Sequence, residues 1–333
     1  MSRGVILANF GGPRSLEEVP SFLTELLTDV DVIRTRFPRF FEKWFFTGIA
    51  KKRARMVAHD YSQIGGKSPI FEDTERWAHN LSLRMGGPVM AFHRYLTATH
   101  ADFIRQIQES HCREWTILPL YPQFSFATTG SSARFFQTVF PKETLSQMQW
   151  VRSYATHPRY VAAMQRCIAD YLHQERLSEK EVVLFFSAHG LPQDFVDQGD
   201  PYEIECQSSF DAIREGFPEA HSLLAFQSKF GRGEWLRPYT SELSAAPLTW
   251  SQGRKHVVFI PLSFTSDHIE TLFEIEYQYL PAIRAHGLQA YRCPALNHRE
   301  DWLQAMVEIL EGSSFVSTET LIRREVSFFT RQT

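Results

Sequence analysis

Two short polar stretches contain the side chains best suited to acid–base or metal chemistry. The stretch 187–192 (Ser-Ala-His-Gly-Leu-Pro) supplies His189, and the stretch 263–270 (Ser-Phe-Thr-Ser-Asp-His-Ile-Glu) supplies Asp267, His268 and Glu270. Imidazole exchanges protons near neutral pH, and nitrogen and oxygen ligands together bind divalent transition metals. These residues therefore predict a site for protons and a metal ion, centred on His189 and Glu270.

A row of acidic side chains extends from this site. Asp267, Glu270 and Glu274 follow one another at spacings of three and four residues, which places them on one face of a helix, and Gln278 continues the row by one turn. Carboxylate oxygens bind hard and borderline cations. Such a row can pass a divalent cation inward or protons outward.

The same residues also allow a purely structural interpretation. Asp267 followed three residues later by Glu270 has the pattern of a capping box, and acidic residues at a helix start favour the helix dipole. His189, taken alone, fits a loop histidine whose hydrogen bonds are satisfied. Spacing leaves both interpretations open.

The elements that must position these residues are short apolar runs that do not alternate with polar residues. Such runs are typical of strands buried on both faces in parallel sheets, where ligands bind beyond the carboxyl ends of the strands. Both polar stretches directly follow such a run. The predicted strands are Val5–Phe10, Val89–Phe92, Trp115–Leu120, Val182–Phe186, Ser222–Phe226 and His256–Leu262.

Helices of suitable length separate these strands, so the predicted class is α/β. A break around Pro141–Pro158 divides the strands into two sets of three, which indicates two similar open-sheet domains of residues 1–150 and 151–304. Pro281 is expected to end the last of the helices. The predicted helices are Ser15–Thr28, Ala98–Gln108, Pro158–Gln174 and Asp267–Leu280.

The composition restricts the class of partner. A formal net charge of -3 over 333 residues supplies no concentrated basic surface, so no nucleic-acid partner is expected. The four cysteines are scattered without a Cys-x-x-Cys pair, which indicates a reducing compartment and no zinc ribbon. No secretory signal and no run of membrane-spanning length is present, and we expect a cytoplasmic protein.

Aromatic residues are concentrated in one segment. The 28 phenylalanines fit either a Phe-rich core or a large flat apolar ligand. In the segment Phe37–Phe46 they occur as consecutive pairs, which spreads them around a helix circumference, and the basic residues Lys51–Arg55 follow. We expect either simple burial or a half-exposed lip that makes a peripheral membrane contact or binds an amphipathic ligand.

Two familiar motifs are incomplete. Gly66-Lys67-Ser68 lacks the first glycine of a phosphate loop, because Tyr61 stands in its place. Gly231 and Gly233 are not followed by the third glycine that a dinucleotide fold needs. Nucleotide and hydride chemistry therefore lose their support.

Several stretches together, in wording and in order, resemble the ferrochelatase family over nearly the whole chain. Each stretch is modest alone, but the set is specific. The stretches are Asn9–Pro13, Ile64–Ile70, Arg94-Tyr95, Tyr121-Pro122-Gln123, Thr128–Ser132, Ser187–Pro192, Gly199–Tyr202, Gln227–Gly231 with Trp235, and Phe264–Thr271.

This resemblance implies two Rossmann-like lobes, each a parallel sheet flanked by helices, with a porphyrin cleft between them. It also implies a C-terminal helix, about residues 305–333, that returns to the first lobe. By the family's pattern His189 and Glu270 flank the macrocycle centre, with Asp267, His268 and Glu274 as a supporting acidic row. The residues expected to bind the porphyrin are Phe10, Arg34, Ser68, Arg94, Tyr95, Trp235 and Phe264, with Arg34 as a propionate partner.

The activity implied is insertion of Fe²⁺ into protoporphyrin IX, with iron as a substrate, no permanently bound cofactor and no iron–sulfur cluster. Three alternatives stay open: coproporphyrin III as the porphyrin, cobalt or nickel insertion into another tetrapyrrole, and a tetrapyrrole carrier without catalysis. A histidine and a glutamate accept several divalent ions, so they do not specify the metal. A carrier, however, has no need of an acidic row opposite a histidine.

Overall fold

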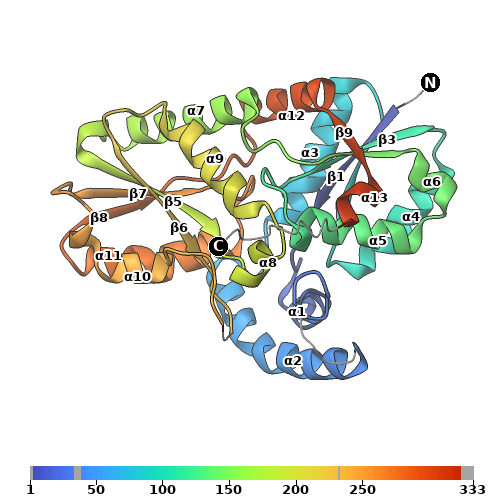
Figure 1. The fold of residues 1–333 in the computed structure, drawn as a ribbon, viewed down its shortest axis with the longest axis horizontal. Helices are drawn as coiled ribbons and strands as arrows, with labels where there is room; N and C mark the ends of the chain where they lie inside the picture. Colours follow the sequence, from blue (N-terminus) through green and yellow to red (C-terminus); the bar gives the residue numbers. More distant parts are fainter. Residues whose placement is uncertain (1–2, 34–38, 232, 324–333) are drawn as a thin grey trace, which may run out of the picture.

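Two parallel β-sheets flanked by helices form the centre of the molecule, one in each lobe (Figure 1). The computed structural model describes residues 3–33, 39–231 and 233–323. The first sheet has the strand order β2-β1-β3-β4-β9 and the second the order β6-β5-β7-β8. All strand pairs are parallel except β4 with β9, so the structure confirms the predicted α/β class and adds one antiparallel edge.

The first lobe is built mainly from the first half of the chain. In the element labels η marks a short 3-10 helix, but η3 and η6 are π-helices. Its elements are β1 (Arg3–Asn9), η1 (Leu16–Glu18), α1 (Val19–Leu27), α2 (Arg39–Gln63), α3 (Ile70–Met85), β2 (Val89–His93), η2 (Thr97–Thr99), α4 (His100–Glu109), β3 (Glu114–Pro119), η3 (Phe126–Gly130), α5 (Ser131–Val139), α6 (Lys142–Ser146) and β4 (Met148–Val151).

The second half of the chain builds the second lobe and then returns. The strand β9 and the helix α13 belong to the first sheet and its helical layer. The elements are α7 (Pro158–Gln174), η4 (Glu179–Glu181), β5 (Val182–His189), α8 (Gln193–Asp197), α9 (Tyr202–Arg214), β6 (His221–Gln227), α10 (Thr240–Ala245), η5 (Pro247–Thr249), β7 (His256–Pro261), the π-helix η6 (Glu270–Tyr279), α11 (Leu280–Arg284), β8 (Gln289–Arg292), α12 (Glu300–Gly312), β9 (Phe315–Ser317) and α13 (Thr318–Ile322).

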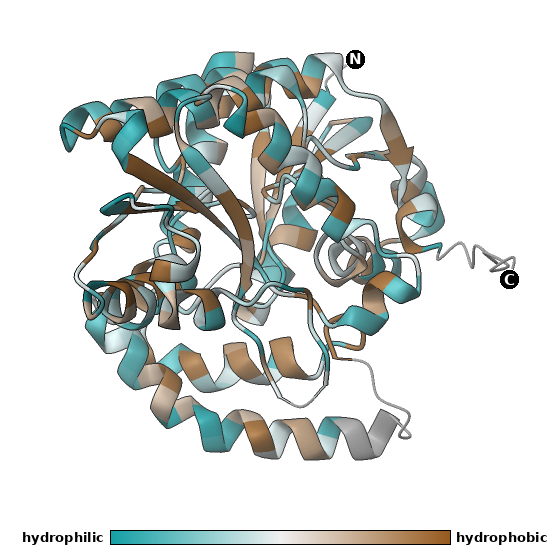
Figure 2. Ribbon diagram, turned by 60° about the vertical axis from the view of Figure 1, so that its left-hand side comes forward, coloured by the Kyte–Doolittle hydropathy of each residue, from teal (hydrophilic) through white to brown (hydrophobic). Residues whose placement is uncertain are grey.

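All six predicted apolar runs form strands: β1, β3, β5 and β7 are buried along almost their whole length, and the edge strands β2 and β6 are buried in their second half. Figure 2 shows these strands as the apolar interior. The strand β5 continues to His189, so the histidine ends the strand and does not lie in the following loop. The short strands β4, β8 and β9 were not predicted, since none contains an apolar run longer than two residues.

The helices differ from prediction mainly after residue 266. The expected C-terminal helix of about residues 305–333 is interrupted, because α12 ends at Gly312 and the strand β9 precedes the short helix α13. The helix Pro158–Gln174 forms as predicted, with Pro158 in its first turn. The predicted helix Asp267–Leu280 is instead the π-helix η6, which begins at Glu270. Pro281 does not end it, because the proline lies in the first turn of α11, where a missing N–H is tolerated.

The two lobes share one apolar core. Its largest cluster joins Leu7 and Trp77 of the first lobe to Met164 and Phe186 of the second, with Trp302 buried in the same cluster. The helix α12 carries Trp302 and packs against both α7 and α3. The lobes are therefore held together along one side by burial of apolar surface.

Candidate functional site

His189 lies where three parallel strands end side by side. It pairs in register with Gln227 at the end of β6, and its main-chain N–H donates to Ser263 Oγ, 2.9 Å away, just after β7. The next residue, Gly190, allows close approach, because an added Cβ would lie 2.6 Å from the main-chain oxygen of Gln227. The sheet thus presents His189 at its carboxyl edge, as expected for ligand binding in this class.

His189 and Glu270 form a close pair, as the sequence predicted. The distance between His189 Nδ1 and Glu270 Oε2 is 2.7 Å, and the two side chains are 39% and 21% exposed. His268 stands on the other side, with Nε2 at 3.8 Å from Glu270 Oε2. His189 Nε2 has no hydrogen-bond partner among the described residues, which leaves this nitrogen for a ligand.

The charges of this pair stabilise each other. Burial by itself lowers the pKa of His189, but the Glu270 carboxylate outweighs it and raises the pKa above the usual value. Burial opposes ionisation of Glu270, yet His189 and His268 hold its pKa well below the usual range. The pair therefore favours imidazolium and carboxylate over two neutral side chains.

Glu274 lies directly behind this pair and is tightly bound by neutral donors. Its Oε2 accepts from Ser228 Oγ at 2.6 Å, from Gln227 Nε2 at 3.2 Å and from Tyr279 OH at 3.5 Å. Burial and the charge of Glu270 raise the pKa of Glu274 to about 7, against the lowering effect of the Ser228 hydrogen bond. Glu274 can therefore take up or release a proton in the physiological range.

Asp267 does not belong to the acidic row, which corrects the prediction from spacing. Its Oδ1 accepts from Thr271 Oγ1 at 2.7 Å and from Arg292 Nη1 at 2.8 Å, and its Oδ2 accepts from Asn297 Nδ2 at 2.7 Å. Because η6 begins only at Glu270, Asp267 precedes the helix.

The capping-box interpretation is wrong as well. The residue at the helix N-cap is Ile269, and the Glu270 carboxylate bonds to His189 instead of reaching back to the chain. The acidic row therefore consists of Glu270 and Glu274. A π-helix interrupts ordinary helix geometry and is frequent at functional sites.

Aromatic side chains lie close to the His189–Glu270 pair. The ring centroid of Phe264 is 6.4 Å from that of His189, and the Trp235 ring lies beside Gly190. In the first lobe Phe10 contacts Tyr95, and it packs in the same apolar group as Ile269 of the second lobe. Phe264 and Trp235 thus lie near His189, whereas Phe10 of the first lobe shares an apolar cluster with Ile269, the residue before Glu270.

The other predicted porphyrin-binding residues make contacts within the first lobe. Arg94 Nη2 donates to Asp29 Oδ2 at 2.8 Å, and Tyr95 OH donates to the same oxygen at 2.9 Å. Ser68 is buried against Gly12. For Ser68, Arg94 and Tyr95 the role in porphyrin binding therefore stays a prediction, and Arg34 lies outside the described residues.

The metal ligands at hand are few. Within residues 3–33, 39–231 and 233–323, no group of three or more His, Cys, Asp or Glu side chains is arranged to hold a metal ion. His189 and Glu270 supply one nitrogen and one carboxylate, and Glu274 lies next to them. Such a sparse set suits an ion that is bound and passed on better than a permanently held one.

Gln227, Ser228 and Ser263 position the site residues and were not assigned this role from the sequence. Ser228 has φ = 63°, in the left-handed region that non-glycine residues rarely adopt. Backbone strain of this kind clusters at functional sites. No residue pattern signals it, because the conformation depends on the surrounding lobe.

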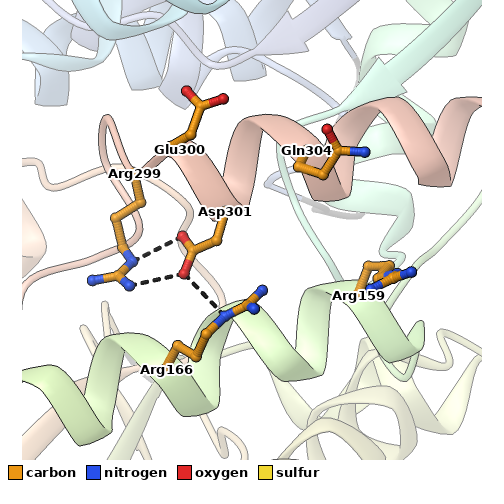
Figure 3. A pocket seen from close by; sticks show the side chains of 6 residues that line it. All are labelled: Arg159, Arg166, Arg299, Glu300, Asp301 and Gln304. Carbon is orange, nitrogen blue, oxygen red and sulfur yellow. Dashed lines mark hydrogen bonds and ion pairs between the residues drawn. The ribbon is translucent and has the colours of Figure 1, made fainter.

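A hollow between α7 and α12 is lined by side chains that form ion pairs. It has a volume of about 690 Å³, and Figure 3 shows Asp301 bridging Arg299 and Arg166. Arg159 pairs with Glu308. The arginines that line this hollow are therefore neutralised by carboxylates, in pairs that run mainly between α7 and α12.

The aromatic lip forms part of the long helix α2, whose side chains are described from Lys43 onward. Trp44 and Phe45 are 77% and 56% exposed, whereas Phe46 packs against the apolar cluster beneath the helix. The expected lip is therefore exposed at two of its aromatic residues, and Figure 1 shows α2 at the edge of the molecule. A hollow of about 940 Å³ is lined by Lys43, Trp44, Phe45, Thr47, Gly48, Ile49, Lys51 and Lys52.

Comparison with known proteins yields consistent relatives. A profile of the family Ferrochelatase matches residues 2–314. The chain is 42% identical to a ferrochelatase of Chlamydia caviae over 97% of this chain and 100% of that protein, and 42% identical to one of Chlamydia muridarum over 92% and 94%.

Solved structures of similar fold have little sequence identity to this chain. SirB from Bacillus subtilis aligns with a TM-score of 0.54 at 10% identity, over 94% of this chain and 96% of that one. CbiX, described as the terminal enzyme of siroheme biosynthesis in denitrifying bacteria, aligns with a TM-score of 0.50 at 13% identity, over 73% and 92%. At these identities the likeness shows the fold alone.

Proposed function

The chain belongs to the ferrochelatase family, and on this premise we propose that it inserts Fe²⁺ into protoporphyrin IX to give protoheme, with release of two protons. It is an enzyme of heme biosynthesis, a lyase that inserts metal into a porphyrin. The observation that carries the proposal is the His189–Glu270 pair, 2.7 Å apart, at a strand edge that also carries Phe264 and Trp235. Iron is the substrate, and the proposal includes no resident cofactor.

The chemistry follows from the shape of a free porphyrin. Two pyrrole N–H groups and two lone pairs point into a hole that a flat ring shields from a metal ion. An enzyme complementary to a bent ring tips a nitrogen lone pair outward and lowers the barrier. Phe10, Trp235 and Phe264 are the side chains we propose to impose this bend.

His189 and Glu270 then handle the metal and the protons. In the metal-free protein the proton of the pair lies on His189, held there by the Glu270 carboxylate. A divalent ion bound at Glu270 offsets that negative charge, lowers the pKa of His189 and so favours release of its proton. His189 is thereby freed as a neutral base that accepts a pyrrole proton. Glu274, with a pKa of about 7, is the group we propose to receive protons next.

The porphyrin substrate is proposed from the apolar character of the lip. The vinyl edges of protoporphyrin suit an apolar surface better than the additional carboxylates of coproporphyrin III do. Arg53 in α2 stacks over the ring of Phe230, 4.4 Å from its centroid, and so lies where α2 meets the second lobe. We propose that the basic residues of Lys51–Arg55, together with Arg34, bind the propionates.

Anaerobic metalation measures the activity directly. Purified protein is mixed with Fe²⁺ and either protoporphyrin IX or coproporphyrin III, and the loss of free-base absorption bands gives the rate. We expect metalation of protoporphyrin IX, and a rate at least about 10²-fold lower in His189→Ala, since general acid–base groups contribute that much. His79→Ala, which removes an exposed histidine of α3, should retain the full rate.

Each other outcome has its own meaning. Metalation of coproporphyrin III alone would replace the proposed porphyrin, and faster insertion of Co²⁺ or Ni²⁺ would replace the proposed metal. Full activity in His189→Ala would remove His189 from the mechanism. Porphyrin that is bound but never metalated, with every metal tried, would contradict the enzyme assignment.

The lip also supports a proposed peripheral membrane contact of a cytoplasmic protein. No helix among the described residues is long and apolar enough to cross a membrane. Exposed Trp44 and Phe45 beside Lys43, Lys51 and Lys52 combine apolar insertion with attraction to anionic lipids. A helix of this kind lies in the membrane interface.

Flotation with lipid vesicles tests this contact. We expect the protein to float with vesicles that contain phosphatidylglycerol and less with purely zwitterionic ones. The variant Trp44→Ser/Phe45→Ser should stay at the bottom of the gradient. Leu83→Ser serves as the control, because Leu83 is 73% exposed on the distant helix α3; equal flotation of all three proteins would refute the role of the lip.

A further inference from the structure

Two family stretches to which no role has been given meet at the boundary between the lobes. The first is residues 199–202 (Gly-Asp-Pro-Tyr), before α9, and the second is the loop that leads into η3. Asp200 is buried, and its Oδ2 accepts from Ser125 Oγ at 2.8 Å and from the main-chain N–H of Phe126 at 2.9 Å. A carboxylate of the second lobe thus binds the start of a helix of the first lobe.

The helix α9 strengthens this contact further along its length. Glu205 Oε2 accepts from the main-chain N–H of Phe124 at 2.7 Å and from Ser153 Oγ at 2.5 Å. Gln123 Nε2 donates to Ser209 Oγ at 2.8 Å. The first two turns of α9 therefore hold the loop 123–126 at several points, and the main chain of that loop is bound as well as its side chains.

Tyr202 connects the same turn to His189. Its main-chain N–H donates to Asp200 Oδ1 at 3.1 Å, and its hydroxyl donates to the main-chain oxygen of His189 at 3.0 Å. Tyr202 is buried, so this hydrogen bond is protected from water. Ser263 and the strand bonds of β5 hold His189 within the second lobe, whereas the path through Tyr202 and Asp200 reaches the first lobe.

We propose that Tyr202 and Asp200 are positioning residues that hold His189 at a fixed distance from the first lobe and thereby set the width of the porphyrin cleft. That the cleft binds a porphyrin rests on the proposed function. The coupling of His189 to the first lobe rests only on the hydrogen bonds of Tyr202 and Asp200. A porphyrin held between the two lobes against His189 requires one gap width. An error of about 1 Å in such a gap can lower a rate by up to about 10²-fold.

The decisive experiment observes His189 in the full-length protein without using activity. The protein is labelled with ¹⁵N in histidine side chains only, and the ring resonance of His189 is assigned by its loss in His189→Ala. Asp200→Asn does not alter a direct contact of His189. We expect it nevertheless to shift the His189 resonance, and we expect no such shift from Asp200→Asn when Tyr202→Phe is already present.

A matched variant separates this effect from general loss of a buried hydroxyl. Tyr154 OH donates to the main-chain oxygen of Pro119 at 3.0 Å, also buried, but makes no contact with His189. Tyr154→Phe should leave the His189 resonance in place. If Asp200→Asn does not fold, Ser125→Ala interrupts the same path from the first lobe and should produce the same shift.

Turnover supplies the second measurement. We expect kcat for metalation to be about tenfold lower in Tyr202→Phe and in Ser125→Ala, with the double variant no slower than either, because both interrupt one path. Tyr154→Phe should retain the wild-type kcat. An unmoved His189 resonance in both Asp200→Asn and Ser125→Ala would overturn the inference, whereas absence of metalation by the wild type would contradict the proposed function alone.

Discussion

At the scale of single residues, Ser228 shows how the site combines strain with hydrogen bonding. Its backbone lies in the left-handed region, which costs a non-glycine residue about 1–2 kcal/mol. In that conformation its hydroxyl reaches Glu274 Oε2 at 2.6 Å and lies 3.4 Å from Glu270 Oε2. The strain is tolerated because the hydroxyl satisfies a buried carboxyl group.

Two substitutions of Ser228 separate these contributions. Ser228→Ala and Ser228→Gly both remove the hydroxyl, and both should lower the metalation rate by about tenfold, the equivalent of about 1.4 kcal/mol. Only glycine relieves the strain, so Ser228→Gly should have a free energy of unfolding about 1 kcal/mol greater than Ser228→Ala. Urea denaturation and the metalation assay measure the two effects, and a fully active Ser228→Ala would exclude the hydroxyl from the mechanism.

At the scale of elements, α9 contains a buried charge that makes stability depend on pH. Burial raises the pKa of Glu205 above its usual value, although Ser153, the Phe124 N–H and Arg152 each act to lower it. The folded protein therefore binds this proton more tightly than the unfolded chain does. The contribution of Glu205 to stability is complete below the ordinary glutamate pKa and is lost as pH rises through the raised one.

Replacement of Glu205 by Gln removes this dependence. Between pH 4 and pH 7 the free energy of unfolding of the wild type should fall relative to that of Glu205→Gln. Urea denaturation of both proteins at several pH values in this range measures the difference. A difference that stays constant with pH would mean that Glu205 titrates alike in the folded and unfolded states.

At the scale of the whole molecule, the end of the described chain completes the first lobe. The strand β9 pairs with β4, and Trp150 Nε1 donates to Thr318 Oγ1 at 3.0 Å. Leu321 of α13 is buried against the cluster that contains Phe136 and Trp150. The chain thus leaves the first lobe at β4, builds the second lobe and returns to cover the edge of the first sheet.

One core substitution measures how much β9 and α13 contribute to the stability of the protein. Leu321→Ala should lower the free energy of unfolding by about 2–4 kcal/mol, as expected for a fully buried leucine. Glu319→Ala, an exposed position on the same short helix, should change it by less than about 0.5 kcal/mol. Similar small losses in both variants would mean that residues 315–322 contribute little to the first lobe.

Local patterns predicted much of the fold and part of the site. Continuous apolar runs are sufficient to predict buried parallel strands, and each of the six formed. The polar residues that follow two of these runs include His189 and Glu270, which the structure places 2.7 Å apart. Glu274 follows Glu270 by four residues, and this spacing places both residues near Gln227 and Ser228.

Other features depended on contacts between distant segments. Asp267 has the right spacing for the acidic row, but Arg292 and Asn297 bind its carboxylate, and neither is near it in the sequence. The sequence shows Arg94 only as a cation that can bind the porphyrin. In the structure its guanidinium forms an ion pair with Asp29. Asp200 contacts the loop 123–126 of the other lobe, and Tyr202 contacts the main chain of His189; no local pattern in the sequence signals either contact.

The sequence by itself determined the α/β class and the ferrochelatase resemblance, and through that resemblance it predicted His189 and Glu270 as the central pair, because hydrophobic periodicity and residue order are properties of the sequence alone. The tertiary structure decided which charges are neutralised, where the π-helix begins and how the two lobes hold His189. These depend on hydrogen bonds and burial between segments far apart in the chain, and the free energy of a buried charge is set by the partner it meets there.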